Sequence, residues 1–257
     1  MTAASSQLPL TGKVAVVTGG SNGIGAASVR MLAAAGATVV IGYNQGRDRA
    51  EALRTGLPGI GHSIQQITNE NAASIAALVT DLKSRHGRCD ILVNSGGTTQ
   101  PVPHANLDQL TDQLFDQILI TNVRGPFAVI RALVPLLTAS SDAASTSVIV
   151  NVSSIAAFTA QGSNIAYCAS KAALDTMTSS LARVLGPHIR VLCVSPGAVA
   201  TDFVAGRGRE HLQKMAQSTP LQRVTEPDDV ARAVLAAVTL LTASTGTSIV
   251  VDGGRHL

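Results

Sequence analysis

Aromatic and charged residues are scarce in this sequence of 257 residues. It contains no Trp, two Tyr and four Phe, and charged residues make up only 14% of the chain. The net charge of +3 comes from arginines scattered along the sequence, with no Lys/Arg run and no basic stripe interleaved with aromatics. Nucleic acid is therefore not an expected partner of this protein.

Cysteine and histidine lack the spacings of metal sites and disulfide frameworks. The three cysteines, Cys89, Cys168 and Cys193, lie far apart without a C-x-x-C pair, and the six histidines show no ligand spacing. The G-x-S-x-G elbow that would indicate a serine hydrolase is also absent from the sequence. We therefore expect no metal site and a reducing compartment.

Two further absences concern membranes. The N-terminal stretch MTAASSQLPLTGK has no basic segment followed by an apolar one. No uninterrupted apolar run approaches the roughly 20 residues that a membrane span requires. We expect a soluble, cytoplasmic protein without membrane contact, in which residues 1–9 form a flexible N-terminus.

Hydrophobic residues, at 46%, are abundant enough for an extensive buried core. Short apolar runs predict buried strands at residues 13–18, 37–42, 62–67, 90–95, 147–153, 189–195 and 248–253. Helical spacing falls between them at residues 24–35, 72–85, 107–137 and 167–185. This alternation predicts a single α/β domain over residues 1–257, with a doubly wound Rossmann-type fold. We expect a parallel sheet of about seven strands with helices on both faces.

The first predicted strand runs directly into the glycine-rich segment TGGSNGIG, residues 18–25. Gly19 and Gly23 permit backbone conformations that other residues resist, and Gly25 lets the next helix pack close to the sheet. The N-terminus of that helix would present unpaired N–H groups to a diphosphate. A tight turn without a ligand is the alternative, but the position at the first strand-to-helix junction favours a dinucleotide site.

The spacing T-G-x-x-x-G-x-G resembles that of the classical short-chain dehydrogenase/reductase family, and further segments match the family pattern in order. They are NSGG at 94–97, Asn122 in TNVRG, Ser154 in NVSS, Tyr167 with Lys171, and SPGAVATD at 195–202. The resemblance extends from about Leu10 to Gly254, and TPLQRVTEPDDVA and VDGG are similar to 3-oxoacyl-(acyl carrier protein) reductase-like members. It implies an enzyme, an NAD(P)(H)-dependent oxidoreductase.

Tyr167 and Lys171 are four residues apart and would project from the same face of a helix. A phenol titrates near pH 10, so a nearby ammonium and the positive charge of an oxidised nicotinamide would bring its pKa towards neutrality. Ser154 lies at the predicted carboxyl end of a strand, where open parallel sheets bind their ligands. The alternatives are a surface Tyr–Lys pair, and Ser153 in place of Ser154.

The resemblance implies a role for each of these side chains. Tyr167 would protonate the developing alkoxide, Ser154 would orient the carbonyl, and Lys171 would bind the nicotinamide ribose. Asn122 would support a proton-relay water, or else be a polar residue in an apolar helix whose amide bonds to backbone. The implied cofactor-binding residues are Gly19, Ser21, Asn22, Gly23, Ile24, Gly25, Tyr43, Asn44, Arg47, Gln66, Ile67, Asn94, Ser95, Gly96, Tyr167, Lys171, Pro196, Gly197, Val199 and Thr201.

The cofactor preference depends on the residues after the second predicted strand. Relatives that use NAD usually carry an acidic residue there, whereas this chain has Tyr43, followed by Asn44, Arg47 and Arg49. A neutral position next to arginines can accommodate a 2′-phosphate, which a carboxylate would repel. We therefore expect NADP(H) rather than NAD(H), with solvated arginines at a helix start as the alternative.

The substrate pocket is expected to follow Ser154, with Phe158 and Gln161, beneath a lid loop at about residues 198–222 that contributes Phe203. Because few aromatics are available to stack on a flat substrate, we expect an aliphatic ketone or a 3-oxoacyl thioester. The alternatives are an NAD-dependent alcohol or sugar dehydrogenase and a catalytically idle dinucleotide-binding sensor.

The predicted helices at 107–137 and 167–185 carry more apolar surface than one face of a sheet is able to cover. Relatives in the family pair these helices between subunits. We therefore expect a homotetramer that acts on a small-molecule carbonyl or alcohol substrate.

Overall fold

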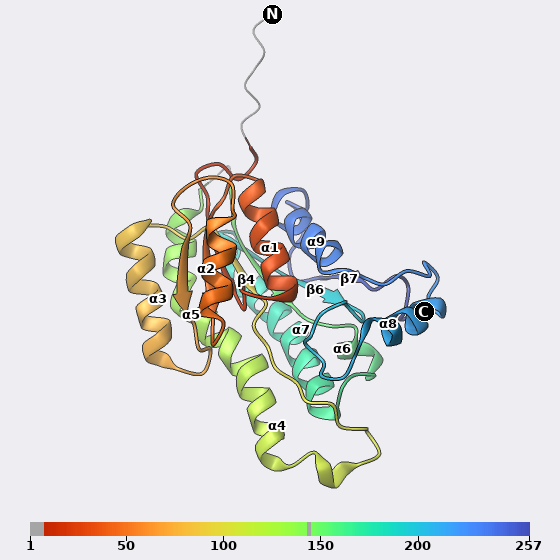
Figure 1. Cartoon of the computed structure of the whole chain (residues 1–257). Helices are drawn as coiled ribbons and strands as arrows, with labels where there is room; N and C mark the ends of the chain where they lie inside the picture. The colour runs from red at the N-terminus through yellow and green to blue at the C-terminus, as the bar shows by residue number, and fades with distance from the viewer. Residues whose placement is uncertain (1–7, 143–144) are drawn as a thin grey trace, which may run out of the picture.

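Seven parallel strands form one sheet in the order β3-β2-β1-β4-β5-β6-β7 (Figure 1). The computed structural model describes residues 8–142 and 145–257, so the flexible N-terminus predicted at 1–9 lies almost entirely outside the described residues. The strands are β1 (Val14–Thr18), β2 (Thr38–Tyr43), β3 (Ser63–Gln66), β4 (Ile91–Asn94), β5 (Ser147–Val152), β6 (Ile189–Pro196) and β7 (Ser248–Val251). All seven predicted strands are confirmed to within two residues at each end.

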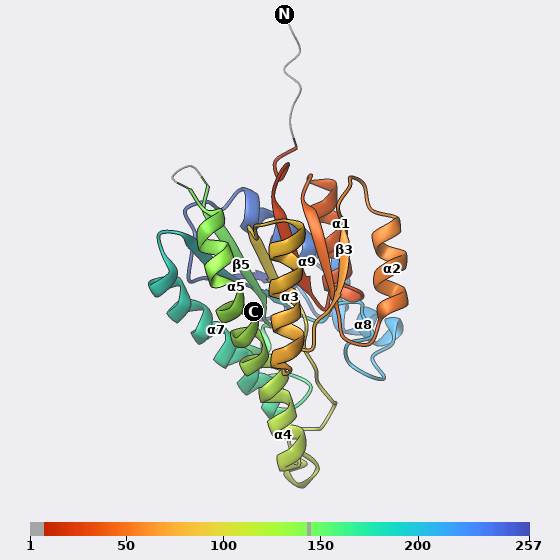
Figure 2. The same ribbon diagram turned by 90° about the vertical axis from the view of Figure 1, so that its left-hand side faces the viewer.

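Helices cover both faces of the sheet, as the two views in Figures 1 and 2 show. On one face α1, α2 and α9 pack over a core that includes Val17, Val29 and Val234. On the other face α3, α5 and α7 pack over a second core that includes Leu78 and Leu133. The helices are α1 (Gly23–Ala34), α2 (Arg47–Thr55), α3 (Ala72–Arg85), α4 (Asp112–Leu119), α5 (Gly125–Ser140), α6 (Ala156–Thr159), α7 (Ile165–Leu185), α8 (Arg209–Gln217) and α9 (Pro227–Thr239). The predicted α/β layering is confirmed.

The strand order reverses between β1 and β4, which lie side by side at the centre of the sheet. Their last residues, Thr18 and Asn94, are partners in the register, so both chains leave the sheet at the same edge. In open α/β sheets, the connections diverge at such a reversal and leave a crevice beyond the carboxyl ends of the strands. The topology therefore fixes where a ligand would bind.

The helix predicted over residues 107–137 is wrong as one continuous element. A 3-10 turn at Leu107–Gln109 is followed by α4, a π-helical turn η2 (Ile120–Arg124) and then α5, which reaches Ser140. Pro126 has no N–H to donate to the carbonyl of Asn122, so the regular α-helical ladder cannot continue through this point. The π-helical turn accommodates the interruption, as such turns do at functional sites.

By length and composition alone, the helical run Asp112–Ser140 could cross a membrane. Core helices of globular proteins pass the same test, and α5 contributes Val129, Ile130 and Leu133 to the buried core. Ile120, Phe127 and Val184 nevertheless stay exposed, by 36%, 40% and 73%. These exposed side chains agree with the expectation that the helices carry more apolar surface than the sheet covers. The homotetramer inferred from that surface stays a prediction.

The segment expected to be a lid loop, residues 198–222, contains a helix. α8 occupies Arg209–Gln217 and buries Leu212 and Ala216 against the rest of the protein. The spacing of these two apolar residues, four apart on one face, is that of an amphipathic helix. The predicted lid segment therefore contains a helix, and its role as a lid stays a prediction.

Candidate active site

The turn from β1 into α1 is built so closely that three of its positions require glycine. Gly19 and Gly23 have φ angles of 63° and 49°, in the left-handed region that glycine adopts without strain. A Cβ added at Gly19 would lie 2.8 Å from the Cα of Gly96 in the neighbouring turn. A Cβ at Gly25 would lie 2.2 Å from the carbonyl oxygen of Gly19. The absence of side chains lets the backbone of α1 approach the crevice directly.

The Asn22 side chain begins α1 by accepting a hydrogen bond from the N–H of Gly23 at 2.8 Å. No acidic residue lies in the first turn of the helix. The partial positive charge of the helix N-terminus is therefore available to an anion in the crevice. This cradle of backbone N–H groups fits the diphosphate of a dinucleotide.

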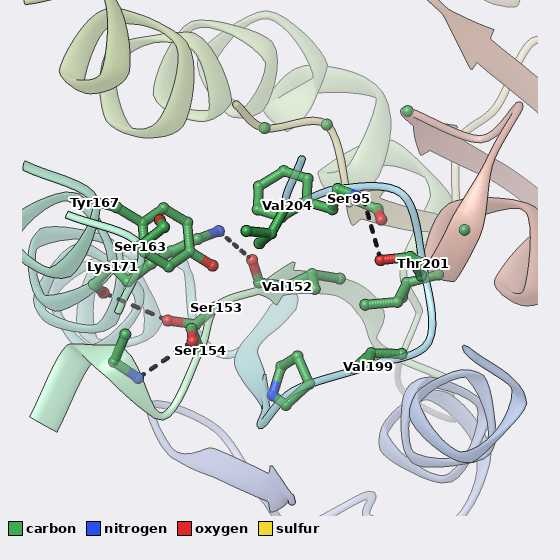
Figure 3. Close-up of a pocket in the computed structure, with 18 of the residues that line it drawn as sticks. Ser95, Val152, Ser153, Ser154, Ser163, Tyr167, Lys171, Val199, Thr201 and Val204 are labelled. Atoms are coloured by element: carbon green, nitrogen blue, oxygen red, sulfur yellow. Dashed lines mark hydrogen bonds between the residues drawn. The ribbon is translucent and has the colours of Figure 1, made fainter. Parts of the chain in front are cut away.

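A cavity of about 680 Å³ opens at the carboxyl edge of the sheet (Figure 3). It contains the glycine turn at one side and the Tyr167 and Lys171 side chains of α7 at another. The predicted site residues that line it are Gly19, Ser21, Asn22, Gly23, Ile24, Asn44, Ile67, Ser95, Gly96, Ser154, Gln161, Tyr167, Lys171, Pro196, Gly197, Val199, Thr201 and Phe203. Segments distant in sequence thus meet in one cavity.

Several predicted site residues do not line this cavity. Gly25 lies beneath the turn, Tyr43 is buried in the core beside α1, and Arg47 is exposed at the start of α2. Four further predicted site residues also do not line the cavity: Gln66, Asn94, Phe158 and Asn122. Contact between these seven residues and a ligand in the cavity therefore stays a prediction.

The side chains of Gln66, Asn94 and Phe158 contact other protein groups. Gln66 Nε2 donates a hydrogen bond to the Asn44 carbonyl at 3.0 Å, and Asn94 Nδ2 donates to Asn151 Oδ1 at 2.9 Å. The Phe158 ring meets the His256 ring edge-on, with 5.8 Å between centroids. Of these three, Gln66 bonds to a residue that lines the cavity, Asn44.

Asn122 is fully engaged with protein groups. Its Nδ2 donates to the Thr98 carbonyl at 2.9 Å and to Ser170 Oγ at 3.1 Å, while its Oδ1 accepts from the Thr98 N–H at 2.8 Å. Only 1% of its surface is exposed. The amide therefore bonds to backbone, and support of a proton-relay water by Asn122 stays a prediction. Asn122 ties the chain after β4 to helix α7, which carries Tyr167 and Lys171.

Helix α7 begins at Ile165, two residues earlier than predicted, because the Asn164 side chain caps it. Asn164 Oδ1 accepts from the N–H of Tyr167 at 2.6 Å, and Asn164 is itself completely buried. Lys171 then follows one turn after Tyr167, with its Nζ 5.7 Å from the centre of the phenol ring. The predicted placement of both side chains on one helical face is confirmed.

Lys171 and Ser154 are both held by neighbouring backbone groups, as the dashed lines in Figure 3 show. Lys171 Nζ donates to the Val152 carbonyl at 2.8 Å, and Ser154 Oγ accepts from the Ala156 N–H at 3.1 Å. The Ser153 hydroxyl instead turns towards the carbonyl of Lys171. Ser154, rather than Ser153, is the serine whose hydroxyl contributes to lowering the pKa of the Tyr167 phenol.

Burial dominates the electrostatics of this group. It raises the pKa of Tyr167 to about 12, against a smaller lowering by the hydrogen bond with Ser154. Burial also lowers the pKa of Lys171 to about 8, against the charges of Cys193 and Asp175. In the protein by itself, burial thus outweighs any lowering of the Tyr167 pKa, and the lowering expected from the ammonium together with a bound oxidised nicotinamide stays a prediction. The ammonium points to the Val152 carbonyl, and desolvation of the phenolate has the larger effect.

At the opposite side of the cavity, Ser21 and Arg49 converge near Gly46. A Cβ at Gly46 would lie 2.6 Å from Arg49 Nη2 and 2.9 Å from Ser21 Oγ, so glycine leaves space for both groups. Asn44 lines the cavity beside them, and its Oδ1 accepts from Thr68 Oγ1 at 3.2 Å. Of the two arginines identified from sequence, Arg49 and not Arg47 lines the cavity.

Sequence reasoning missed several lining residues at the other end of the cavity. Arg207 and Met215 come from the segment that contains α8, and Arg255 follows β7 near the C-terminus. Arg255 could have been predicted to lie near the site because it follows a parallel strand, and all segments that follow such strands leave the sheet at the same edge. Arg207 carried no signal, since the path of a long connection is not set by local pattern.

Comparisons with known proteins agree with this site. A family model described as enoyl-(acyl carrier protein) reductase matches residues 19–256. The "granaticin polyketide synthase putative ketoacyl reductase 2" of Streptomyces violaceoruber is 38% identical, over 95% of this chain and 96% of its own length. The 3alpha-hydroxysteroid dehydrogenase of Mediterraneibacter gnavus is 35% identical, over 96% and 98% of the two chains.

A solved structure of a short-chain dehydrogenase from Burkholderia cenocepacia in complex with NADP is 33% identical to the chain. It superposes with a TM-score of 0.83 over 97% of this chain and all of its own. Another, the 3-ketoacyl-(acyl-carrier-protein) reductase of Brucella melitensis complexed with NADH, is 30% identical and has a TM-score of 0.85 over 96% and 99% of the two chains. The chain therefore belongs to the short-chain dehydrogenase/reductase family of nicotinamide-dependent oxidoreductases.

Proposed function

We propose that the protein reduces a ketone or a 3-oxoacyl thioester to the hydroxy compound with NADPH. The observation that carries this proposal is that Tyr167, Ser154 and Lys171 line one cavity together with the glycine turn. The ketoacyl reductase relative supports the substrate class. Within the family, steroid and sugar dehydrogenases are related at 35% and 34% identity, so overall similarity does not select between substrates.

The side chains divide the work of the reduction. The Ser154 and Tyr167 hydroxyls would donate hydrogen bonds to the carbonyl oxygen and hold the carbonyl carbon in position. When bound, the reduced nicotinamide supplies a hydride to that carbon. Tyr167 would give its proton to the oxygen, and its pKa of about 12 keeps the proton on the phenol at neutral pH. Lys171 would bind the nicotinamide ribose through its ammonium.

Turnover measurements test this proposal directly. NADPH consumption should be followed with a panel of aliphatic ketones and 3-oxoacyl thioesters, alongside the reverse reaction with alcohols, sugars and NAD⁺. Reduction of panel members with NADPH supports the proposal. Faster oxidation of an alcohol or a sugar with NAD⁺ would instead assign the protein as a dehydrogenase.

We expect the Arg49→Gln variant to lose affinity for NADPH by about tenfold, because a charge-assisted hydrogen bond to the 2′-phosphate is removed. Its affinity for NADH should change by less than about twofold. Fluorescence titrations with both cofactors measure the two values. Arg47→Gln is the matched control, since Arg47 lies on the same helix but does not line the cavity. Equal losses for NADPH and NADH would contradict the assignment.

The lowered pKa of Lys171 predicts a pH dependence. The side chain is a cation below about pH 8 and becomes neutral as the pH rises through that value. We therefore expect kcat/KM for NADPH to fall above about pH 8, while the Tyr167 phenol stays protonated. The pH profile of Lys171→Arg is the comparison, because a guanidinium keeps its charge and should move the fall to higher pH. A wild-type profile that is flat to about pH 10 would show that this ammonium is not required.

A further inference from the structure

Two arginines meet in the cavity on segments that are far apart in the sequence. Arg207 precedes α8, and Arg255 follows β7. The two segments are tied together because the Leu221 N–H, just beyond α8, donates to the Gly253 carbonyl at 3.1 Å. The fold thus places two guanidinium groups in the cavity that contains Tyr167.

Neither guanidinium has a carboxylate partner among residues 8–142 and 145–257. The nearby Arg209 binds Glu226 at 2.9 Å, and Arg223 binds Asp229 at 3.2 Å. Two carboxylates line the same cavity, Glu70 and Asp202, yet neither lies within ion-pair distance of Arg207 or Arg255. The two arginines differ in this respect from Arg209 and Arg223, and they share it with Arg49 of the same cavity.

The environment of Arg207 is unfavourable for a cation. The side chain is partly buried, and burial lowers the pKa of its guanidinium; Tyr167 opposes this lowering, and the like charge of Arg255 adds to it. A partly desolvated charge without a partner destabilises the protein unless another group compensates for it. An anion between the two guanidiniums would compensate for both the burial and the repulsion.

We propose that Arg207 and Arg255 bind an anionic group of the substrate, so that the substrate is a carbonyl compound with a carboxylate or a phosphate. This inference rests on the proposed reduction. Arginine pairs recognise both groups through charge-assisted, bidentate hydrogen bonds. The anion itself is unchanged in the reaction. The carbonyl carbon gains a hydride from NADPH, the oxygen gains the proton of Tyr167, and solvent returns that proton to the phenol.

The phosphates of the cofactor are the other source of an anion. The glycine turn and Arg49 offer sites for those phosphates, and Arg207 lines a second cavity together with Gly23 and Arg49, whereas Arg255 does not. Experiments at saturating NADP⁺ separate the two sources, because the anion sites of the cofactor are then occupied.

Calorimetric titration of the NADP⁺ complex tests the proposal with three probes: 3-hydroxybutyrate, its neutral amide and inorganic phosphate. We expect the wild-type complex to bind at least one of the two anions and to bind the amide at least tenfold more weakly. Arg207→Gln and Arg255→Gln should each weaken binding of that anion about tenfold, and the double variant should abolish it. Arg209→Gln is the control, because Arg209 binds Glu226 and does not line this cavity. Thermal unfolding of each variant confirms that it folds.

Three results would overturn the proposal. They are binding of neither anion by the wild-type complex, binding of the amide as tightly as the carboxylate, and wild-type anion affinity in the double variant. A loss of NADP⁺ affinity in the double variant without a loss of anion binding would assign the arginines to the cofactor. Anion binding that depends on both arginines, together with no reduction of any panel carbonyl, would uphold the anion site and contradict the proposed reduction instead.

Discussion

Replacement of Tyr167 by Phe is expected to lower kcat for carbonyl reduction by about 10²–10⁴-fold, the range that general acid catalysis contributes. The change removes one oxygen atom and keeps the aromatic ring, whose centroid lies 6.0 Å from the centroid of the Phe203 ring. Because the phenol is buried and protonated, its loss removes the proton donor without leaving a buried charge. The rate of NADPH consumption with a panel carbonyl measures the effect.

The affinity for NADPH separates a chemical role of Tyr167 from a structural one. Lys171, which we propose to bind the ribose, stays in place because its Nζ bonds to the Val152 carbonyl and not to the phenol. We therefore expect NADPH affinity within about threefold of wild type, and an unchanged unfolding temperature. Ser154→Ala provides a second comparison, since it removes the hydroxyl partner of Tyr167 and should also lower kcat. Full turnover by Tyr167→Phe would refute its role as the acid.

The layers of this fold were predictable because strand and helix patterns are local. Buried parallel strands are apolar on both faces, and the seven runs recognised from sequence correspond to β1 to β7. Helix boundaries were less predictable where a side chain decides them. Asn164 starts α7 two residues early, and the interruption between α4 and α5 coincides with Asn122 and Pro126.

The site was predictable where it depends on position after a strand. The glycine turn, Ser154 and Thr201 all follow strands and line the cavity. The direction of the Tyr167 pKa was not predictable, because the sequence shows the nearby lysine but not the depth of burial. The electrostatic balance at Tyr167 is decided by desolvation, which depends on packing of the whole chain.

The Gly25→Ala variant is expected to lose both stability and cofactor affinity. A methyl group at this position would lie 2.2 Å from the Gly19 carbonyl oxygen, which is far inside van der Waals contact. Helix α1 must then move away from the turn, and overpacking of this kind typically costs about 1–3 kcal/mol. For a protein of this size, we expect the unfolding temperature to fall by roughly 2–12 °C.

The loss of cofactor affinity should exceed what the loss of stability explains. Gly25 does not line the cavity, so an effect on NADPH binding can arise only through displacement of the α1 N-terminus and the backbone of Gly19. Gly56→Ala is the matched control, because a Cβ there meets nothing closer than 3.7 Å and its φ is −92°. We expect at least tenfold weaker NADPH binding for Gly25→Ala at a temperature where both variants are folded. Wild-type affinity in a folded Gly25→Ala protein would mean that close approach of α1 is needed for packing and not for binding the diphosphate.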